Sequence, residues 1–219
     1  MHNNITGPRK RRAAEVGRKK KKQPVRKEKF SCVEGCSDCC IYREYYPSTD
    51  FGKIGVLLLP EEKGRMEKLA REKEVEIKIL PRLGVGRSST GPEKIIAYQM
   101  MGRHEKDGDW CPFLDHYRRS PHGGFACSIY AQRPLACSAY PVIGADKKKG
   151  ATLDPHCQFC RHRPDSSMCT SLEGLQGELE SLSKIKAAVR VEDDDMRVWR
   201  YATATGEKAA LGEGWILES

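Results

Sequence analysis

The chain has 219 residues, of which 38% are hydrophobic and 32% are charged, and its net charge is +9 at pH 7. This composition predicts one domain with a modest core plus an extra segment, and excludes a large apolar core. The longest apolar run, residues 56–59, is too short to span a bilayer, and ten cysteines are too sparse for a small secreted disulfide scaffold.

The basic charge is concentrated at the N-terminus. Residues 1–30 contain twelve Lys and Arg and two Glu, a net charge of +10, so the remaining residues carry a net charge of −1. Such a segment repels itself and buries little, so we expect residues 1–29 to be a disordered tail. Its basic residues, within 9–29, would suit nonspecific contact with the phosphates of RNA or DNA, and a solubilising extension is the alternative.

The N-terminal thirty residues also bear on location. They contain no apolar stretch of seven or more residues, and therefore no recognisable secretory signal. We expect a soluble, cytoplasmic protein that contacts no membrane; in a eukaryote, the two basic blocks would also suit nuclear import. Grouped cysteines in a reducing compartment bind metal more often than they form disulfides.

A helix is predicted near residues 61–73. Pro60 suits a first helical turn, and Glu61 and Glu62 suit the positive end of the helix dipole. The next segment alternates between apolar and charged residues, which predicts a half-buried strand through Val75, Ile77 and Ile79. A second strand is predicted at residues 95–98. The loop between the two strands is marked by its turn formers: Gly84, Gly86, Gly91 and Pro92.

The C-terminal part predicts one strong amphipathic helix near residues 172–190, with Ser171 as its N-cap. Its apolar residues step by three and four: Leu172, Leu175, Leu179, Leu182, Ile185 and Val189. A hairpin around Gly206 is expected between residues 198 and 215. The predicted fold class is α+β, a small irregular metal-stabilised domain with few short strands. Residues 30–170 would form the cysteine-cluster domain, and 171–219 would pack on it.

The densest group of cysteines is Cys32, Cys36, Cys39 and Cys40, four thiols within nine residues. Two or three intervening residues let one tight turn present two sulfurs to the same centre, as in Cys36-x2-Cys39. Adjacent side chains are expected to point apart, so Cys39 and Cys40 would serve different irons or different centres, or one would ligate while the other reacts or packs. This group is expected to share its centre with sulfurs further along the chain.

The downstream thiols lie among apolar residues that would shield a metal site from water: Phe113, Leu114, Ile129 and Tyr130. Nine thiols exceed the four that one zinc ion needs, so two sites, or one cluster with spare cysteines, both remain open. The expected cofactor is an iron–sulfur cluster, with [4Fe–4S] as the first choice, or zinc. The candidate ligands are Cys32, Cys36, Cys39, Cys40, Cys111, Cys127, Cys137, Cys157 and Cys160.

The other candidate ligands are weaker. Cys169 stands apart from the groups, and His156 and His162 flank the Cys157-x2-Cys160 pair, where they would replace a thiolate only in a mixed site. Three more histidines are expected to face solvent: His104, His116 and His122. Arg133 would either donate hydrogen bonds to the thiolates or form a surface salt bridge.

Three segments resemble the CxxCxxCC family, also known as the YkgJ-like cysteine-cluster proteins: residues 30–40, 111–114 and 127–141. The resemblance covers residues 30–165 and implies binding of zinc or an iron–sulfur cluster. The spacing of three residues after Cys32 and the serine at Ser138 depart from the family pattern. Because some relatives look like flagellin lysine methylases, a metal-dependent protein-modifying enzyme is one alternative function, although no glycine-rich loop for S-adenosylmethionine is evident. A nucleic-acid adapter that uses the basic tail is another alternative, and the protein partner is unknown.

Overall fold

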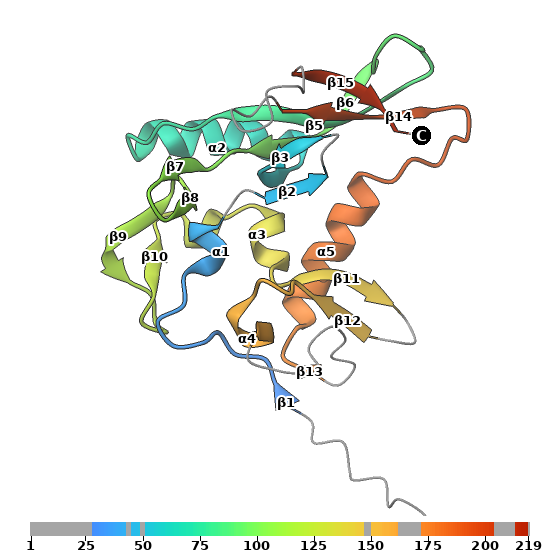
Figure 1. The fold of residues 1–219 in the computed structure, drawn as a ribbon. Helices are drawn as coiled ribbons and strands as arrows, with labels where there is room; N and C mark the ends of the chain where they lie inside the picture. Colours follow the sequence, from blue (N-terminus) through green and yellow to red (C-terminus); the bar gives the residue numbers. More distant parts are fainter. Residues whose placement is uncertain are drawn as a thin grey trace, which may run out of the picture.

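The structure is a computed structural model that describes residues 28–42, 45–48, 51–146, 150–161, 172–203 and 213–218. It mixes helices and sheets, as the predicted α+β class requires (Figure 1). Within the described part of the chain, no helix is both long and apolar enough to cross a membrane. The predicted basic tail lies outside the described residues except for Glu28 and Lys29, so its disorder and its RNA or DNA contacts stay predictions.

A five-stranded antiparallel sheet forms one half of the molecule (Figure 1). Its strand order is β15-β14-β5-β6-β4, so the two C-terminal strands extend a sheet that the first half of the chain begins. The strands are β4 (Val56–Leu58), β5 (Ile79–Gly86), β6 (Lys94–Met100), β14 (Arg197–Ala202) and β15 (Gly214–Leu217). The pairing of β14 with β15 confirms the C-terminal hairpin, and Gly206 lies outside the described residues.

Helix α2 (Pro60–Glu72) packs against β4 and β6 and confirms the helix predicted near residues 61–73. Pro60 occupies its first turn, where no backbone N–H is needed. The stripe of apolar side chains predicted for this helix is buried. Together with the strands and the following loop it forms the first core: Val56, Leu58, Met66, Leu69, Ala70, Met100, Cys111, Phe113, Leu114 and Ile129.

The strand predicted through Val75, Ile77 and Ile79 is wrong in its limits. Residues 75–78 are irregular, and β5 begins at Ile79 and continues to Gly86. Val75 and Ile77 pack against the first core from the irregular segment, and Ile79 does so from the first residue of β5, which explains the alternation of apolar residues. Gly84 and Gly86 therefore lie in the strand and not in a loop. The second predicted strand is confirmed within β6.

The remaining strands pair two by two, and they are more numerous than the few that the sequence predicts. These pairs are β1 (Glu28–Lys29) with β13 (Leu172–Glu173), β2 (Tyr45–Ser48) with β3 (Gly52–Ile54), β7 (Arg103–Glu105) with β8 (Gly108–Trp110), β9 (Leu114–Arg119) with β10 (Phe125–Cys127), and β11 (Val142–Asp146) with β12 (Gly150–Leu153). Most of these pieces are too short to be stable alone.

Short helices accompany these strand pairs. They are α1 (Asp38–Ile41), the 3-10 turn η1 (Tyr130–Gln132), α3 (Leu135–Ala139) and α4 (Gln158–Arg161). Helix α5 (Gln176–Ala188) packs against α3 and begins four residues later than predicted, because residues 172–173 pair with β1 instead. Leu175 precedes α5 as its N-cap and is buried, whereas the predicted N-cap, Ser171, lies outside the described residues.

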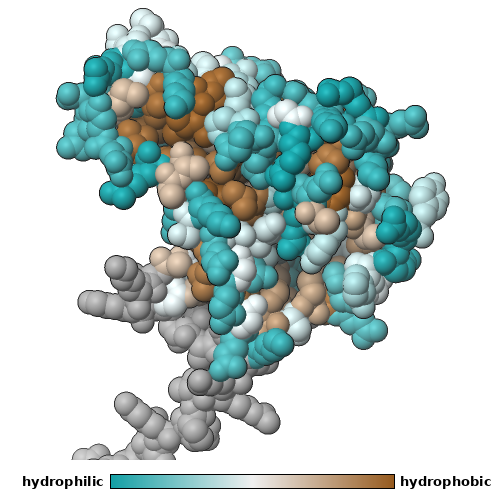
Figure 2. Space-filling model, turned by 180° about the vertical axis from the view of Figure 1, so that it is seen from behind, coloured by the Kyte–Doolittle hydropathy of each residue, from teal (hydrophilic) through white to brown (hydrophobic). Residues whose placement is uncertain are grey.

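The surface agrees with the low hydrophobic content. Seen from behind, it is mostly hydrophilic, and its apolar side chains gather in separate patches (Figure 2).

A second core lies between β11, β12, α4 and the start of α5, and consists of Val142, Ala151, Leu153, Cys157, Phe159, Cys160 and Leu175.

Candidate metal centre

The loop before α1 is attached to the turn between β9 and β10. Gly35 adopts a φ of +76°, and its N–H donates to the carbonyl of His122 at 2.7 Å. The Ser37 hydroxyl accepts the N–H of Phe125 at 2.7 Å. A Cβ on Gly124 would lie 2.2 Å from the carbonyl oxygen of Cys36, so this close approach requires glycine. The sequence between Cys32 and α1 is thus held against residues about ninety positions downstream by contacts that exclude larger side chains.

Cys39 and Cys40 both lie on α1, and their sulfur atoms are 3.9 Å apart. The expectation that the two side chains point apart is wrong, because it assumed an extended backbone, and here the backbone is helical. Both cysteines line the same cavity.

Three further thiols reach this cavity from separate elements. The N–H of Cys111 donates to the carbonyl of Cys40 at 2.6 Å, which fixes α1 against the loop before β9. Cys127 ends β10, and Cys137 lies in α3. Each position depends on tertiary contacts, since the three segments are distant in sequence.

A buried carboxylate positions α3. Glu62 is only 3% exposed, and one of its oxygens accepts the N–H of Leu135 at 2.9 Å and a guanidinium N–H of Arg65 at 3.0 Å. Its other oxygen accepts the N–H of Leu59 at 3.0 Å. A buried carboxylate needs such partners, and here they connect α2 to the start of the helix that carries Cys137.

The last pair of thiols divides between two environments. Cys157 lines the cavity, whereas Cys160 is buried in the second core and does not line it. The N–H of Cys160 donates to the carbonyl of Cys157 at 2.8 Å, which starts α4. Arg161, at the end of α4, lies 3.8 Å from the carboxylate of Asp38 on α1.

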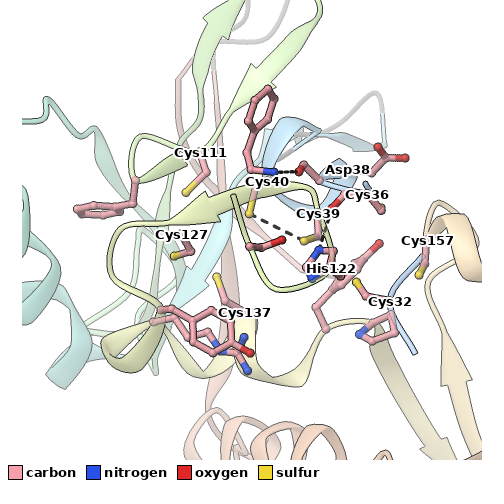
Figure 3. A pocket seen from close by; sticks show the side chains of 18 of the residues that line it. Cys32, Cys36, Asp38, Cys39, Cys40, Cys111, His122, Cys127, Cys137 and Cys157 are labelled. Atoms are coloured by element: carbon pink, nitrogen blue, oxygen red, sulfur yellow. Dashed lines mark hydrogen bonds between the residues drawn. The ribbon is translucent and has the colours of Figure 1, made fainter. Parts of the chain in front are cut away.

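One cavity of about 260 Å³ thus collects eight of the nine candidate cysteines. Figure 3 shows their side chains arranged around it, with His122 and Asp38 beside them. Of the apolar residues predicted to wall the site, Leu114 is buried in the adjoining core and the others line the cavity. The full apolar lining is Phe30, Met100, Phe113, Phe125, Ile129, Tyr130, Pro134, Tyr140 and Pro141.

The protein environment disfavours thiolates in the absence of a cation. Although part of the Cys32 side chain reaches the surface, burial, followed by the charges of Cys39, Cys36 and Cys157, raises its pKa to about 11. Burial also raises the pKa of Cys36 and that of Cys157. A bound cation would reverse this preference, because a thiolate that coordinates a metal is deprotonated outright.

The donor chemistry fits a soft metal. Thiolate donors select zinc or iron–sulfur clusters, and the cavity presents eight sulfurs in an apolar surround. Among the described residues, no three His, Cys, Asp or Glu side chains are arranged to hold a metal ion as they stand.

Of the three histidines predicted to face solvent, two make contacts with other parts of the fold. His104 is solvent-exposed, as predicted, and lies 3.0 Å from Asp109. His116 instead packs against the rings of Trp110 and Phe125, and His122 lines the cavity with its Nε2 3.0 Å from the carbonyl of Cys36. Sequence reasoning missed His122, because nothing in its polar surroundings indicates contact with a loop eighty-six residues away.

Of the weaker candidates that the structure describes, Arg133 lines the cavity and His156 does not. His156 is exposed and bonds to Asp154, while His162 and Cys169 lie outside the described residues. Arg133 lines the cavity, stacks on the Tyr130 ring at 4.2 Å and donates to the hydroxyl of Ser138 at 3.1 Å. Ser138, which departs from the expected pattern, thus has a contact of its own.

Comparison with known proteins agrees with this geometry. The family model CxxCxxCC, described as "putative zinc- or iron-chelating domain", matches residues 31–161. That span contains all nine candidate cysteines and most of the cavity lining. No curated protein and no solved structure matches the chain. The match covers more than half of the chain, and the chain belongs to the CxxCxxCC family of zinc- or iron-chelating domains.

Proposed function

We propose that the protein carries an iron–sulfur centre on the thiolates of its cavity, and that this centre stabilises the cysteine-rich half of the fold. The observation that carries the proposal is the convergence of eight cysteine side chains, from five separate segments, on one cavity of about 260 Å³. The metal-chelating character of the family supports it.

The volume of the cavity favours a cluster over a single ion. One zinc ion binds four thiolates at about 2.3 Å and leaves no open space between them. A cavity of about 260 Å³ is larger than the space inside one such tetrahedron and leaves room for a polynuclear core. The preferred cluster type is [4Fe–4S], which four of the cavity cysteines would hold.

The residues of the chain would have distinct tasks. The cavity cysteines would bind the centre, and aromatic side chains such as Phe113 and Phe125 would exclude water and lower the local dielectric. Cys160 and His122 would support the ligand loops: Cys160 through its bond to Cys157, and His122 through its contact with the Cys36 carbonyl. A bound cluster supplies covalent cross-links between distant segments and a site for electron transfer.

The test is metal and sulfide analysis of the full chain purified without oxygen, together with its visible spectrum. We expect iron and acid-labile sulfide in similar amounts and a broad absorbance near about 400 nm that is lost on oxidation. A colourless protein that contains zinc would overturn the iron–sulfur assignment while leaving chelation intact. A protein that binds neither metal would contradict the whole proposal.

A further inference from the structure

We propose that the cavity holds two separate four-thiolate centres and that α1 contributes one cysteine to each of them. The inference rests on the proposed function and specifies how its thiols are divided. The inner set is Cys40, Cys111, Cys127 and Cys137; the outer set is Cys32, Cys36, Cys39 and Cys157.

The inner set belongs to the first core. Cys111 is part of that core, and the other three members pack against it. The backbone bond from Cys111 to the carbonyl of Cys40 holds two members together at 2.6 Å. In Figure 3 the four inner sulfurs lie on one side of the cavity, away from Cys157 and Cys32.

The outer set lies at the second core. Cys157 is part of that core, and Phe30 and Val33, which flank Cys32, pack against it. The N–H of Cys36 donates to the carbonyl of Val33 at 3.1 Å, so Cys36 follows Cys32 within one tight turn. Figure 3 shows these four side chains together on the opposite side from Cys111 and Cys127.

Cys39 and Cys40 are the point where the two sets meet. Consecutive residues of a helix differ in direction by about 100°, so one turn can direct neighbouring side chains to two centres. Their sulfur separation of 3.9 Å would also suit the edge of one zinc tetrahedron, so this distance alone decides nothing. The positions of the other thiols decide which centre each cysteine serves, because each of the two has three further sulfurs on its own side.

A division of closely spaced cysteines between two centres has a chemical precedent. In two-cluster ferredoxins, one run of cysteines supplies three ligands to one cluster and its fourth to the other. Here Cys32, Cys36 and Cys39 would serve the outer centre and Cys40 the inner one. The inner centre would connect α1 to β10 and α3, and the outer centre would connect it to α4.

Cobalt(II) titration of the metal-free full chain tests this division, because tetrahedral cobalt–thiolate sites have a characteristic visible spectrum whichever metal is native. The variants are Cys111→Ser for the inner set and Cys157→Ser for the outer set, and each is the control for the other. Native mass spectrometry counts the bound ions.

We expect wild type to bind two cobalt ions per chain, both with all-thiolate spectra. Each variant should keep one all-thiolate ion, while its altered site weakens by at least about a hundred-fold, and the double variant should keep neither. A wild type that saturates at one tightly bound ion, which either substitution removes, would overturn the two-centre inference and leave the proposed function standing. A wild type that binds no cobalt would also overturn the two-centre inference, whereas the proposed function is decided separately by the iron and sulfide analysis. The wild-type stoichiometry decides the question even where a variant fails to fold.

Discussion

The five-stranded sheet and the cysteine-rich half are held together in different ways. The sheet has strands of up to eight residues, and helix α2 has thirteen residues with a buried apolar stripe. Apart from α5, the cysteine-rich half has helices of four or five residues and ladders of two strands (Figure 1). Helices and hairpins of this length are marginal in water, so their stability must come from elsewhere.

The two halves fill their interiors differently. The sheet half buries side chains such as Leu58 and Met66 completely and satisfies its backbone by pairing. The other half brings eight sulfurs together around a cavity instead of filling that space with side chains. The sheet half is thus stabilised by apolar packing and, in our proposal, the cysteine-rich half is stabilised by metal coordination.

Removal of the metal should have the largest effect on stability, and it should affect the cysteine-rich half much more than the sheet half. Structural metal sites contribute of the order of 10 kcal/mol to folding, and helices of four or five residues are marginal by themselves. We expect hydrogen exchange to accelerate strongly in α1, α3 and α4 after chelation, and far less in β5 and β6. Equal protection of all these elements with and without metal would show that the centre is not structural.

Leu58→Ala tests the apolar packing of the first core, which Cys111 shares. Leu58 is fully buried in the first core, and truncation of such a side chain costs about 3 kcal/mol of unfolding free energy. Denaturant unfolding of the metal-loaded protein should show this loss, with the number of bound metal ions unchanged. The control is Leu217→Ala, at a position that is 40% exposed, where the change should stay within about 0.5 kcal/mol. Metal loss in the Leu58 variant would contradict the separation of the halves.

Glu62→Gln tests the connection between the two halves. The amide has one oxygen where the carboxylate has two, so a backbone N–H of Leu59 or Leu135 would face an NH2 group. We expect a loss of about 2 kcal/mol in unfolding free energy, since charged hydrogen bonds in buried sites have this magnitude.

The matched control for this substitution is Glu67→Gln on the same helix. Glu67 pairs with Lys63 at the surface, where an ion pair contributes about 0.5 kcal/mol or less. Similar losses in both variants would show that Glu62 is an ordinary surface-like carboxylate and does not connect α2 to α3.

Gly124→Ala should affect metal binding more than general stability. The added methyl group would collide with the Cys36 carbonyl and with the Ser37 hydroxyl, at 2.2 and 2.6 Å. Because these contacts orient the ligand loop, we expect metal affinity to fall about 10- to 100-fold in a competition assay with a chelator. Gly64→Ala in α2 has open space around it and should instead stabilise the protein by about 0.5–1 kcal/mol.

Cys160→Ala should have the smallest effect on the centre. Cys160 is buried in the second core and does not line the cavity, so the variant should lose about 1 kcal/mol of stability and keep its full metal content. Loss of one metal equivalent would show that Cys160 is a ligand, as the sequence spacing predicts, and that the outer centre uses it.

The sequence predicted the family, helix α2, strand β6 and the C-terminal hairpin, because each depends on local patterns or on motif spacing. It misplaced the start of β5 and of α5, because irregular segments can carry apolar residues at strand or helix spacing when they pack on a core. It also assigned His122 to solvent, since a contact across eighty-six residues has no local signal.

By itself, the sequence determined that this protein is a thiol-rich metal chelator, because donor type and close spacing are written directly in the order of residues. Only the tertiary structure decided which thiols meet. It turned Cys39 and Cys40 toward the same cavity, brought Cys111 against Cys40, and left Cys160 in the second core. The reason is physical: proximity between distant segments is set by packing and backbone hydrogen bonds, which no spacing along the chain records.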